Sequence, residues 1–238
     1  MRGNGVMALD HSQSLDGVPL LAPLTAAARD DLARQCRWKR YEPGEVIIDS
    51  QGQSREVYFI TQGTVRVVNF SISGREITLA EVGAGHFFGE LAAVDGGPRS
   101  ASVVASGPKT TAAIMPGDVF LGLCTRSPEI GLQIMIRLAR MVRQNNERIM
   151  DLSTLGANNR VVAELLRLAL AVSKDGISAE IRPIPVHSDL ASRVSTTRET
   201  VARVFSDLSR RKIIERKKDV LVVHDLDQLA LMVEDVKG

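Results

Sequence analysis

Glycines recur about every ten residues between positions 44 and 85, and the segments between them are short and rich in β-branched and aromatic residues. Short runs of this composition, bounded by turn residues, are typical of antiparallel strands. We therefore predict an antiparallel β-sandwich or barrel with tight corners over residues 41–118. Examples of the expected strands are 46–48, 57–60, 64–68, 77–79 and 102–105.

One motif interrupts this strand pattern. It comprises Phe88-Gly89-Glu90-Leu91-Ala92 and, after a short gap, Pro98-Arg99-Ser100-Ala101-Ser102. An arginine binds phosphate oxygens through two parallel charge-assisted hydrogen bonds, and Gly89 lets a ligand approach the backbone. Ser100 adds a hydroxyl donor, and Glu90 is suited to accept from a sugar hydroxyl. The motif predicts a site for a sugar phosphate ester; the alternative is a surface ion pair across a hairpin, contributing about 0–1 kcal/mol.

A long helix follows the strands. Ser127 is suited to cap this helix, and Pro128 is suited to its first position. The helical pattern continues to about Leu155, which gives a helix close to 40 Å long. Apolar residues recur at heptad spacing around one polar residue, which indicates a dimer coiled coil rather than a buried core helix. The seam residues are Ile134, Leu138, Met141, Asn145 and Leu152. The Gly156 region then forms a predicted hinge.

Residues 187–208 have the pattern of a helix-turn-helix. A short helix over 187–194, capped by Ser188 or Asp189, is followed by a turn at 195–196 and a second helix from Thr197 to Leu208. The apolar positions that would close the core between the helices are Leu190, Val194, Val201, Val204 and Leu208. The exposed face would present Arg198, Glu199 and Arg203 to the major groove, where Arg reads guanine and Glu reads cytosine. The hydroxyls of Ser195, Thr197 and Thr200 suit phosphate contacts.

Charge is concentrated around this motif. Residues 181–218 contain ten Lys or Arg and four Asp or Glu, which leaves that window at +6 and the rest of the chain at −4. Basic clusters at 210–212 and 216–218 flank a predicted two-stranded wing, 213–215 and 220–224. A cationic patch on an otherwise acidic chain indicates a polyanionic partner with salt-dependent attraction.

Length and composition set the frame. At 238 residues, 44% hydrophobic and 24% charged, the chain is expected to form two globular domains. We predict a flexible tail over 1–17, an N-terminal domain over 18–155 that includes the long helix (about 127–155), and a C-terminal domain over 156–238. No apolar run reaches membrane length. Cys36 and Cys124 match no metal spacing and are interpreted as buried thiols in a reducing, cytoplasmic compartment.

Taken together, the motifs resemble those of the CRP/FNR superfamily of bacterial transcription regulators, from about Leu20 onward. The most specific pieces are 88–91 with Arg99-Ser100, and the segment 198–203. The resemblance implies an α+β fold: an N-terminal antiparallel β-roll (the cyclic-nucleotide-binding jelly roll), a long dimerisation helix and a C-terminal winged helix-turn-helix. We call residues 89–92 and 99–101 the cassette.

The resemblance also implies residue roles. Arg99 and Ser100 would hold the cyclic phosphate with backbone at Gly89 and Ala101, beside Leu91 and Ala92, while Glu90 takes the ribose 2′-hydroxyl. Arg198, Glu199 and Arg203 would read a half-site like TGTGA.

Departures from the family pattern restrict which ligands the protein is expected to bind. There is no N-terminal cysteine cluster, which disfavours an iron–sulfur sensor, and only His86 lies near enough to the cassette to suggest a haem ligand. The Thr-Ser pair that contacts the purine in cyclic-AMP-specific members aligns with Asn145-Asn146. An amide both donates and accepts, so it suits adenine N6 or guanine O6. Cyclic AMP and cyclic GMP are therefore both candidates; alternatively, Asn145 only fixes dimer register.

Together with these motifs, the resemblance implies a homodimeric, cyclic-nucleotide-responsive regulator that binds double-stranded DNA and RNA polymerase, without a metal and without a membrane. The nucleotide would bridge the β-roll and the long helices and favour the arrangement that binds DNA. One alternative is a family member that binds DNA without ligand or senses another small molecule. A second is an enzyme such as a nucleotide hydrolase, but no Ser-His-Asp, metal-ligand or paired-carboxylate arrangement supports catalysis.

Overall fold

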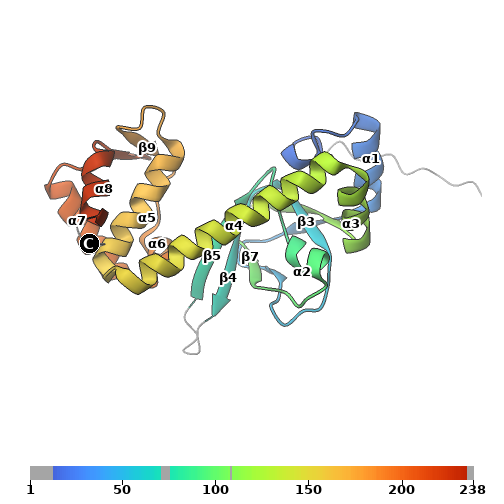
Figure 1. The fold of residues 1–238 in the computed structure, drawn as a ribbon, viewed down its shortest axis with the longest axis horizontal. Coiled ribbons are helices and arrows are strands. Elements are labelled where there is room, and N and C mark those ends of the chain that lie inside the picture. Colours follow the sequence, from blue (N-terminus) through green and yellow to red (C-terminus); the bar gives the residue numbers. More distant parts are fainter. Residues whose placement is uncertain (1–12, 71–75, 108, 235–238) are drawn as a thin grey trace, which may run out of the picture. The chain divides into compact units, whose positions relative to one another are not determined.

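The computed structural model describes residues 13–70, 76–107 and 109–234. Contacts divide the chain into two units, Met1–Ala139 and Arg140–Gly238, and each is considered separately. The boundary falls inside a helix, α4 (Pro128–Thr154), which Figure 1 shows as one continuous element. The sequence instead suggested a boundary at the end of that helix.

Two four-stranded antiparallel sheets form the first unit. One has the order β1-β8-β3-β6 and the other the order β2-β7-β4-β5. The bounds are β1 Arg37–Tyr41, β2 Val46–Ile48, β3 Val57–Gln62, β4 Thr64–Phe70, β5 Glu76–Gly83, β6 Phe87–Phe88, β7 Ser102–Ala105 and β8 Thr110–Met115. The five strands expected from the sequence are present as β2, β3, β4, β5 and β7, and the predicted β-roll is confirmed.

Strands β1, β6 and β8 are not among the examples that the sequence pattern offered. Strand β1 reads Arg-Trp-Lys-Arg-Tyr and lies at the edge of its sheet. Edge strands commonly carry charged side chains, so this segment resembles a surface loop when it is read alone. Strand β6 has only two residues, too few for a recognisable pattern.

Strand β3 separates two cores. Successive side chains of a strand point to opposite faces. Tyr58 and Ile60 therefore belong to the core between the sheets, and Val57 and Phe59 to a second core shared with helices. Those helices are η1 (Pro19–Leu21), α1 (Ala26–Gln35), α2 (Glu90–Asp95), α3 (Gly117–Arg126) and the first turns of α4.

The N-terminal segment is anchored to this second core. Leu15 is 1% exposed and Val18 is 2% exposed. Thr25 caps helix α1, because its hydroxyl accepts a hydrogen bond from the Ala28 N–H at 3.3 Å. The predicted flexible tail over 1–17 thus contains a packed residue, Leu15, and its first twelve positions lie outside the described residues.

Helix α4 corrects the predicted heptad seam. Ile134 is only 5% exposed, and Leu138 packs with it against the second core, the one that β3 shares with the helices. The N-terminal end of the predicted seam therefore faces its own domain, not a partner. A different apolar face of α4 is exposed, at Leu132 (53%), Met135 (61%), Val142 (59%) and Ile149 (60%). We call these four residues the α4 stripe; the heptad pattern alone could not tell which apolar face was already covered.

The second unit is a winged helix-turn-helix. Its elements are α5 Ala157–Val172, β9 Ala179–Ile181, α6 His187–Arg193, α7 Arg198–Arg210, β10 Ile214–Arg216, β11 Leu221–Val223 and α8 Leu226–Glu234. The predicted wing is confirmed by the antiparallel pairing of Ile214 with Val223, and β9 adds a third strand that the sequence did not predict. All five residues expected to close the helix-turn-helix core are buried.

Helix α6 lacks the side-chain cap expected at its start. It begins at His187, after Val186, and no side chain caps it, so the predicted cap by Ser188 or Asp189 is wrong. The break between α4 and α5 is confirmed, and it comprises only Leu155 and Gly156.

In the described part of the chain, no helix combines the length and the apolar character that crossing a membrane requires. The same residues contain no group of three or more His, Cys, Asp or Glu side chains that could hold a metal. Cys36 is buried, and burial raises the pKa of its thiol to about 12. Cys124 is half-buried and also a free thiol.

Candidate functional site

Gly89 is the conformational centre of the cassette. It connects β6 to the short helix α2 (Glu90–Asp95) with a φ of +85°, a left-handed conformation that favours glycine. A Cβ at this position would lie 2.8 Å from Arg99 Nη1 and 2.9 Å from the Glu56 carbonyl oxygen. The site therefore needs glycine both for its backbone conformation and for the close approach of Arg99.

Arg99 is buried, at 6% exposure, and is held by neutral oxygens. Nη1 donates to the Gly89 carbonyl at 2.9 Å, and Nη2 donates to the Ser54 hydroxyl at 2.8 Å and to the Glu56 carbonyl at 2.9 Å. Nε donates to the same Ser54 hydroxyl at 3.3 Å. Within the described residues Arg99 forms no ion pair.

This environment is suited to an anion. Burial lowers the pKa of its guanidinium, while Tyr58, Glu56 and Glu90 act in the opposite direction. Buried charges in proteins are normally paired or coordinated, and a guanidinium without a contacting carboxylate retains its positive field. Its planar fork suits a phosphate. The residues present therefore fit a phosphate ester, as the sequence indicated.

Glu90 is also buried, at 3% exposure, but it has a cationic partner. Nε of Arg137 lies 3.3 Å from Glu90 Oε1, and Nη2 of Arg137 donates to the Phe87 carbonyl at 3.1 Å. The Arg137 guanidinium also lies over the Phe87 ring, 4.5 Å from its centroid. Arg137 thus orients the Glu90 carboxylate, a role that the sequence pattern did not predict.

The position of Arg137 on α4 explains its role once the packed face of the helix is known. It lies between Ile134 and Leu138, on the side of α4 that packs onto its own domain. A charged residue among apolar positions of a packed face needs a buried partner, and Glu90 supplies one.

The other cassette residues surround this centre. Ala92 and Ala101 are buried, Leu91 is half-buried and the Ser100 side chain is exposed. The Ser100 carbonyl accepts a hydrogen bond from Asn69 Nδ2 at 3.3 Å. The structure therefore brings Gly89, Glu90 and Arg99 together with Ser100 and Ala101 beside them. Asn145 and Asn146 lie in the other unit, on exposed positions of α4.

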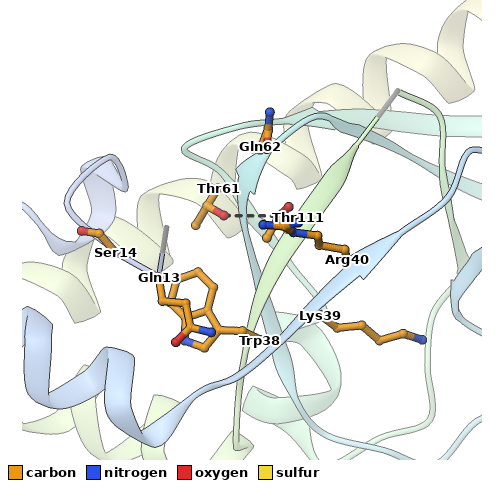
Figure 2. A pocket seen from close by; sticks show the side chains of 8 residues that line it. All are labelled: Gln13, Ser14, Trp38, Lys39, Arg40, Thr61, Gln62 and Thr111. Atoms are coloured by element: carbon orange, nitrogen blue, oxygen red, sulfur yellow. Dashed lines mark hydrogen bonds between the residues drawn. The ribbon is translucent and has the colours of Figure 1, made fainter. Parts of the chain in front are cut away.

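A groove of about 480 Å³ lies elsewhere on the first unit. Figure 2 shows the side chains that line it, from β1, β3, β8 and the segment before η1. The indole of Trp38 is fixed there by a hydrogen bond of 3.1 Å to the Ala33 carbonyl. This groove shares no residue with the cassette.

The second candidate site is helix α7 and the turn before it. Thr197 caps α7, and its hydroxyl accepts from the Thr200 N–H at 3.2 Å. Arg198, Glu199 and Arg203 are all exposed, while the opposite face of α7 is buried in the domain core. Bonds from its own backbone N–H and from Thr197 lower the pKa of Glu199, so it is an ionised acceptor at neutral pH.

The turn itself is ordered by its backbone. Ser195 adopts a φ of +51° and Thr196 is buried, with its N–H donating to the Ala191 carbonyl at 2.9 Å. Ser195 is half-buried and Thr200 is half-buried, so their hydroxyls are less accessible than that of Thr197.

Basic side chains extend onto the wing. Arg216, Lys217 and Lys218 are exposed at the end of β10 and in the turn before β11. Glu215 lies 3.5 Å from Lys217 and 3.2 Å from His224. An exposed helix face with Arg and Glu, capped by Thr and flanked by a basic wing, is suited to a DNA groove and its phosphates.

These two sites define a class: transcription regulators with a helix-turn-helix and a small-molecule-binding β-roll. Comparison with known families agrees. A cyclic nucleotide-binding domain model matches residues 38–127, and a Crp-like helix-turn-helix domain model matches residues 159–232. The chain belongs to the CRP/FNR family of transcription regulators.

Relatives with described functions cover most of the chain. The cyclic AMP receptor protein of Thermus thermophilus is 31% identical, over 84% of this chain and 89% of that protein. A CRP-like cAMP-activated global transcriptional regulator of Mycobacterium tuberculosis is 27% identical over the same shares. Among solved structures, a CooA mutant from Carboxydothermus hydrogenoformans has a TM-score of 0.77 at 21% identity, covering 93% of this chain and 98% of that chain, and supports the fold.

Proposed function

We propose that the chain is a dimeric transcription regulator that responds to cyclic AMP, cyclic GMP or both and binds a palindromic operator with TGTGA-like half-sites. The observation that carries the proposal is Arg99: a buried guanidinium held against Gly89, with no contacting carboxylate in the described part of the chain. A cyclic phosphate would supply the missing negative charge. The regulators named above act with cyclic AMP, which supports the same ligand class.

Different residues of the cassette would bind the phosphate and the ribose of the nucleotide. A guanidinium has five N–H groups, and four of those of Arg99 already have acceptors. Two parallel bonds to a phosphate would therefore require Arg99 to exchange the Ser54 hydroxyl for a phosphate oxygen. Ser100 and the Ala101 backbone would complete the phosphate contacts, beside Gly89. Glu90, oriented by Arg137, would accept from the ribose 2′-hydroxyl.

Base selection is assigned to Asn145 and Asn146. Both are exposed on α4, and an amide side chain both donates and accepts. Either residue is compatible with the amine of adenine and with the carbonyl of guanine. This chemistry supports a response to cyclic AMP, cyclic GMP or both.

The α4 stripe supports dimerisation with a second copy of the chain. Its four apolar residues follow spacings of three, seven and seven positions, which keep one face of a helix toward a parallel or antiparallel partner. Residues at such positions are costly to leave in water, at roughly 25 cal/mol per Å² of apolar surface. Asn146 falls between Val142 and Ile149 and would add a polar position to this seam.

The dimer would place two α7 helices in successive major grooves. Arg198, Glu199 and Arg203 would read base edges, and Ser195, Thr197 and Thr200 would contact phosphates. Two half-sites one DNA turn apart require a defined spacing of these helices. The nucleotide would favour that spacing by binding the competent state more tightly, and DNA would then strengthen nucleotide binding by the same factor. RNA polymerase is the expected further partner, the cytoplasm the expected compartment, and no catalytic step is assigned.

Calorimetry with cyclic AMP and cyclic GMP tests the proposal, followed by operator binding with each nucleotide. Wild type should bind at least one nucleotide, and that nucleotide should raise operator affinity. Arg99→Gln should lose both effects while melting as a folded protein. Arg40→Gln changes an exposed arginine in the groove outside the cassette and should behave as wild type. A full response in Arg99→Gln would refute the site assignment.

A second candidate function is DNA binding without a nucleotide, or with another small molecule. Arg99 favours it in one respect, because the protein's own oxygens already satisfy most of its donors. In that case neither nucleotide binds wild type, and Arg99→Gln changes stability without changing operator affinity.

A further inference from the structure

Three consecutive backbone carbonyls, at the end of α6 and in the turn that follows it, accept hydrogen bonds from arginines. Arg148 of α4 donates through Nη2 to the Arg193 carbonyl at 2.7 Å. Arg160 of α5 donates through Nε to the Val194 carbonyl at 2.8 Å and through Nη2 to the Ser195 carbonyl at 3.1 Å. Carbonyls at a helix C-terminus lack intrahelical partners and attract cations.

Arg160 makes a fourth link with the remaining arm of its guanidinium. Nη1 donates to the carbonyl of Leu155 at 2.9 Å, in the two-residue break between α4 and α5. One side chain therefore holds both the break and the turn of the helix-turn-helix. The planar guanidinium of arginine suits such a set of acceptors, and the ammonium of a lysine could not reach all of them in the same geometry.

Two buried carboxylates extend this network across the unit. Asp151 of α4 lies 2.7 Å from Nη2 of Arg167, and Arg167 also pairs with Glu164 on its own helix, α5. Glu164 lies 3.5 Å from Nη1 of Arg193, at the end of α6. Asp151 and Glu164 are each 8% exposed, so these charges are largely removed from water. The ion pairs thus connect α4 to α5 and α5 to α6.

We propose that Arg148 and Arg160 are positioning residues that fix the helix-turn-helix to the C-terminal turns of α4. The break at Leu155 and Gly156 is then a braced joint, not a free hinge as the sequence suggested. The recognition helix α7 follows the last turns of α4 as one body, and the change that prepares the protein for DNA occurs N-terminal to Arg148. The regulatory part of this inference rests on the proposed function.

Two observations independent of the arginines agree. The contact boundary between the units lies at Ala139 and Arg140, so the C-terminal half of α4 already belongs with the DNA-binding elements. The turn that the arginines hold is itself rigid, since the Thr196 N–H returns to the Ala191 carbonyl. A displacement of its carbonyls is therefore transmitted to Thr197, the cap of α7.

Hydrogen exchange and operator binding by the full chain test the brace. Arg148→Met and Arg160→Met should raise amide exchange about tenfold at 155–157 and 193–196, because charge-assisted bonds are lost. The ratio of operator affinities with and without the effective nucleotide should fall about tenfold, within the usual range of coupling factors. Nucleotide affinity by calorimetry should stay within about twofold of wild type in the absence of DNA.

Conservative variants separate positioning from general stability. Arg148→Lys should restore coupling, because an ammonium can still donate to the Arg193 carbonyl, whereas Arg160→Lys should not, because the Arg160 guanidinium donates to three separate carbonyls. Arg182→Met removes exposed ion pairs to Glu180 and Asp219 in the same unit and should leave exchange at 155–157 unchanged. If a Met variant does not fold, Asp151→Asn weakens the same network and takes its place.

Wild-type exchange and wild-type coupling in the Arg148 and Arg160 variants would overturn the brace. Failure of the proposed function has a different signature. If wild type binds neither nucleotide, the function is wrong, and the exchange rates at 155–157 still decide whether the arginines hold the joint.

Discussion

Arg99 and Gly89 are joined by a hydrogen bond of 2.9 Å from the guanidinium Nη1 to the backbone carbonyl oxygen, across ten positions of the chain. This bond connects the two segments of the cassette. The absence of a Cβ at Gly89 allows the approach, since a Cβ there would lie 2.8 Å from the same nitrogen. The two residues therefore form one unit, and changes at either should affect both stability and ligand binding.

Gly89→Ala should destabilise the protein by about 1–3 kcal/mol through backbone strain and displace Arg99. Urea unfolding and nucleotide calorimetry measure the two effects. Gly44→Ala is a matched control, because Gly44 also has a φ of +85° but a Cβ there meets nothing within 4 Å. It should lose stability but retain nucleotide binding, and equal binding by both variants would contradict the role of Gly89.

Arg137→Met should cost about 3 kcal/mol, the lower end for breaking a buried pair, because Glu90 is buried while Arg137 is about a third exposed. Denaturant unfolding gives this number. Arg37→Met, which removes an exposed pair with Glu56, should cost less than about 1 kcal/mol. A loss at Arg137 as small as the loss at Arg37 would mean that Glu90 does not depend on its partner.

Val142→Glu should convert a dimer into monomers without unfolding them, because it places a charge in the α4 stripe. Sedimentation velocity reports the mass and circular dichroism the fold. Leu170→Glu changes an equally exposed apolar residue on α5 and should leave the dimer intact. A dimer that persists in Val142→Glu would show that another surface holds the two copies.

Arg203→Ala should cost about 1–3 kcal/mol on the preferred operator and relax the choice of base at one position of each half-site. Lys218→Ala on the wing should instead weaken all sequences equally and reduce the salt slope by about one. Selection from random DNA together with a salt titration distinguishes these outcomes. Unchanged base preference in Arg203→Ala would remove it from the readout.

Asp175→Asn should loosen the loop between α5 and β9. Hydrogen bonds from the N–H groups of Ser178 and Ile177 lower the pKa of Asp175 to about 2. Because the folded pKa lies below the unfolded value of 3.8, the carboxylate stabilises the fold above pH 4, and this contribution disappears as the pH falls through 2. The stability difference between wild type and Asp175→Asn should therefore be largest at neutral pH. An Asp175 titration near pH 4 by NMR would contradict this account.

Local sequence predicted the cassette residues of the candidate site but not Arg137, which orients one of them. Gly89, Glu90 and Arg99 were found because cassette chemistry is confined to a short segment with fixed spacing. Arg137 was not, because its link to Glu90 spans 47 positions and depends on which face of α4 packs inward. For the same reason the predicted seam at Ile134 and Leu138 was wrong, while the α4 stripe emerged only from burial.

The sequence by itself determined the order of parts: short strands bounded by glycines, a long capped helix, and a helix-turn-helix whose five core positions are all buried. These features are encoded by local periodicity and turn residues, which act over a few positions. Only the tertiary structure decided that Arg99 is held by Gly89, Ser54 and Glu56, and that Arg148 and Arg160 secure the turn before α7. Those relationships join residues distant in the chain, and no local pattern specifies which acceptors a buried guanidinium will meet.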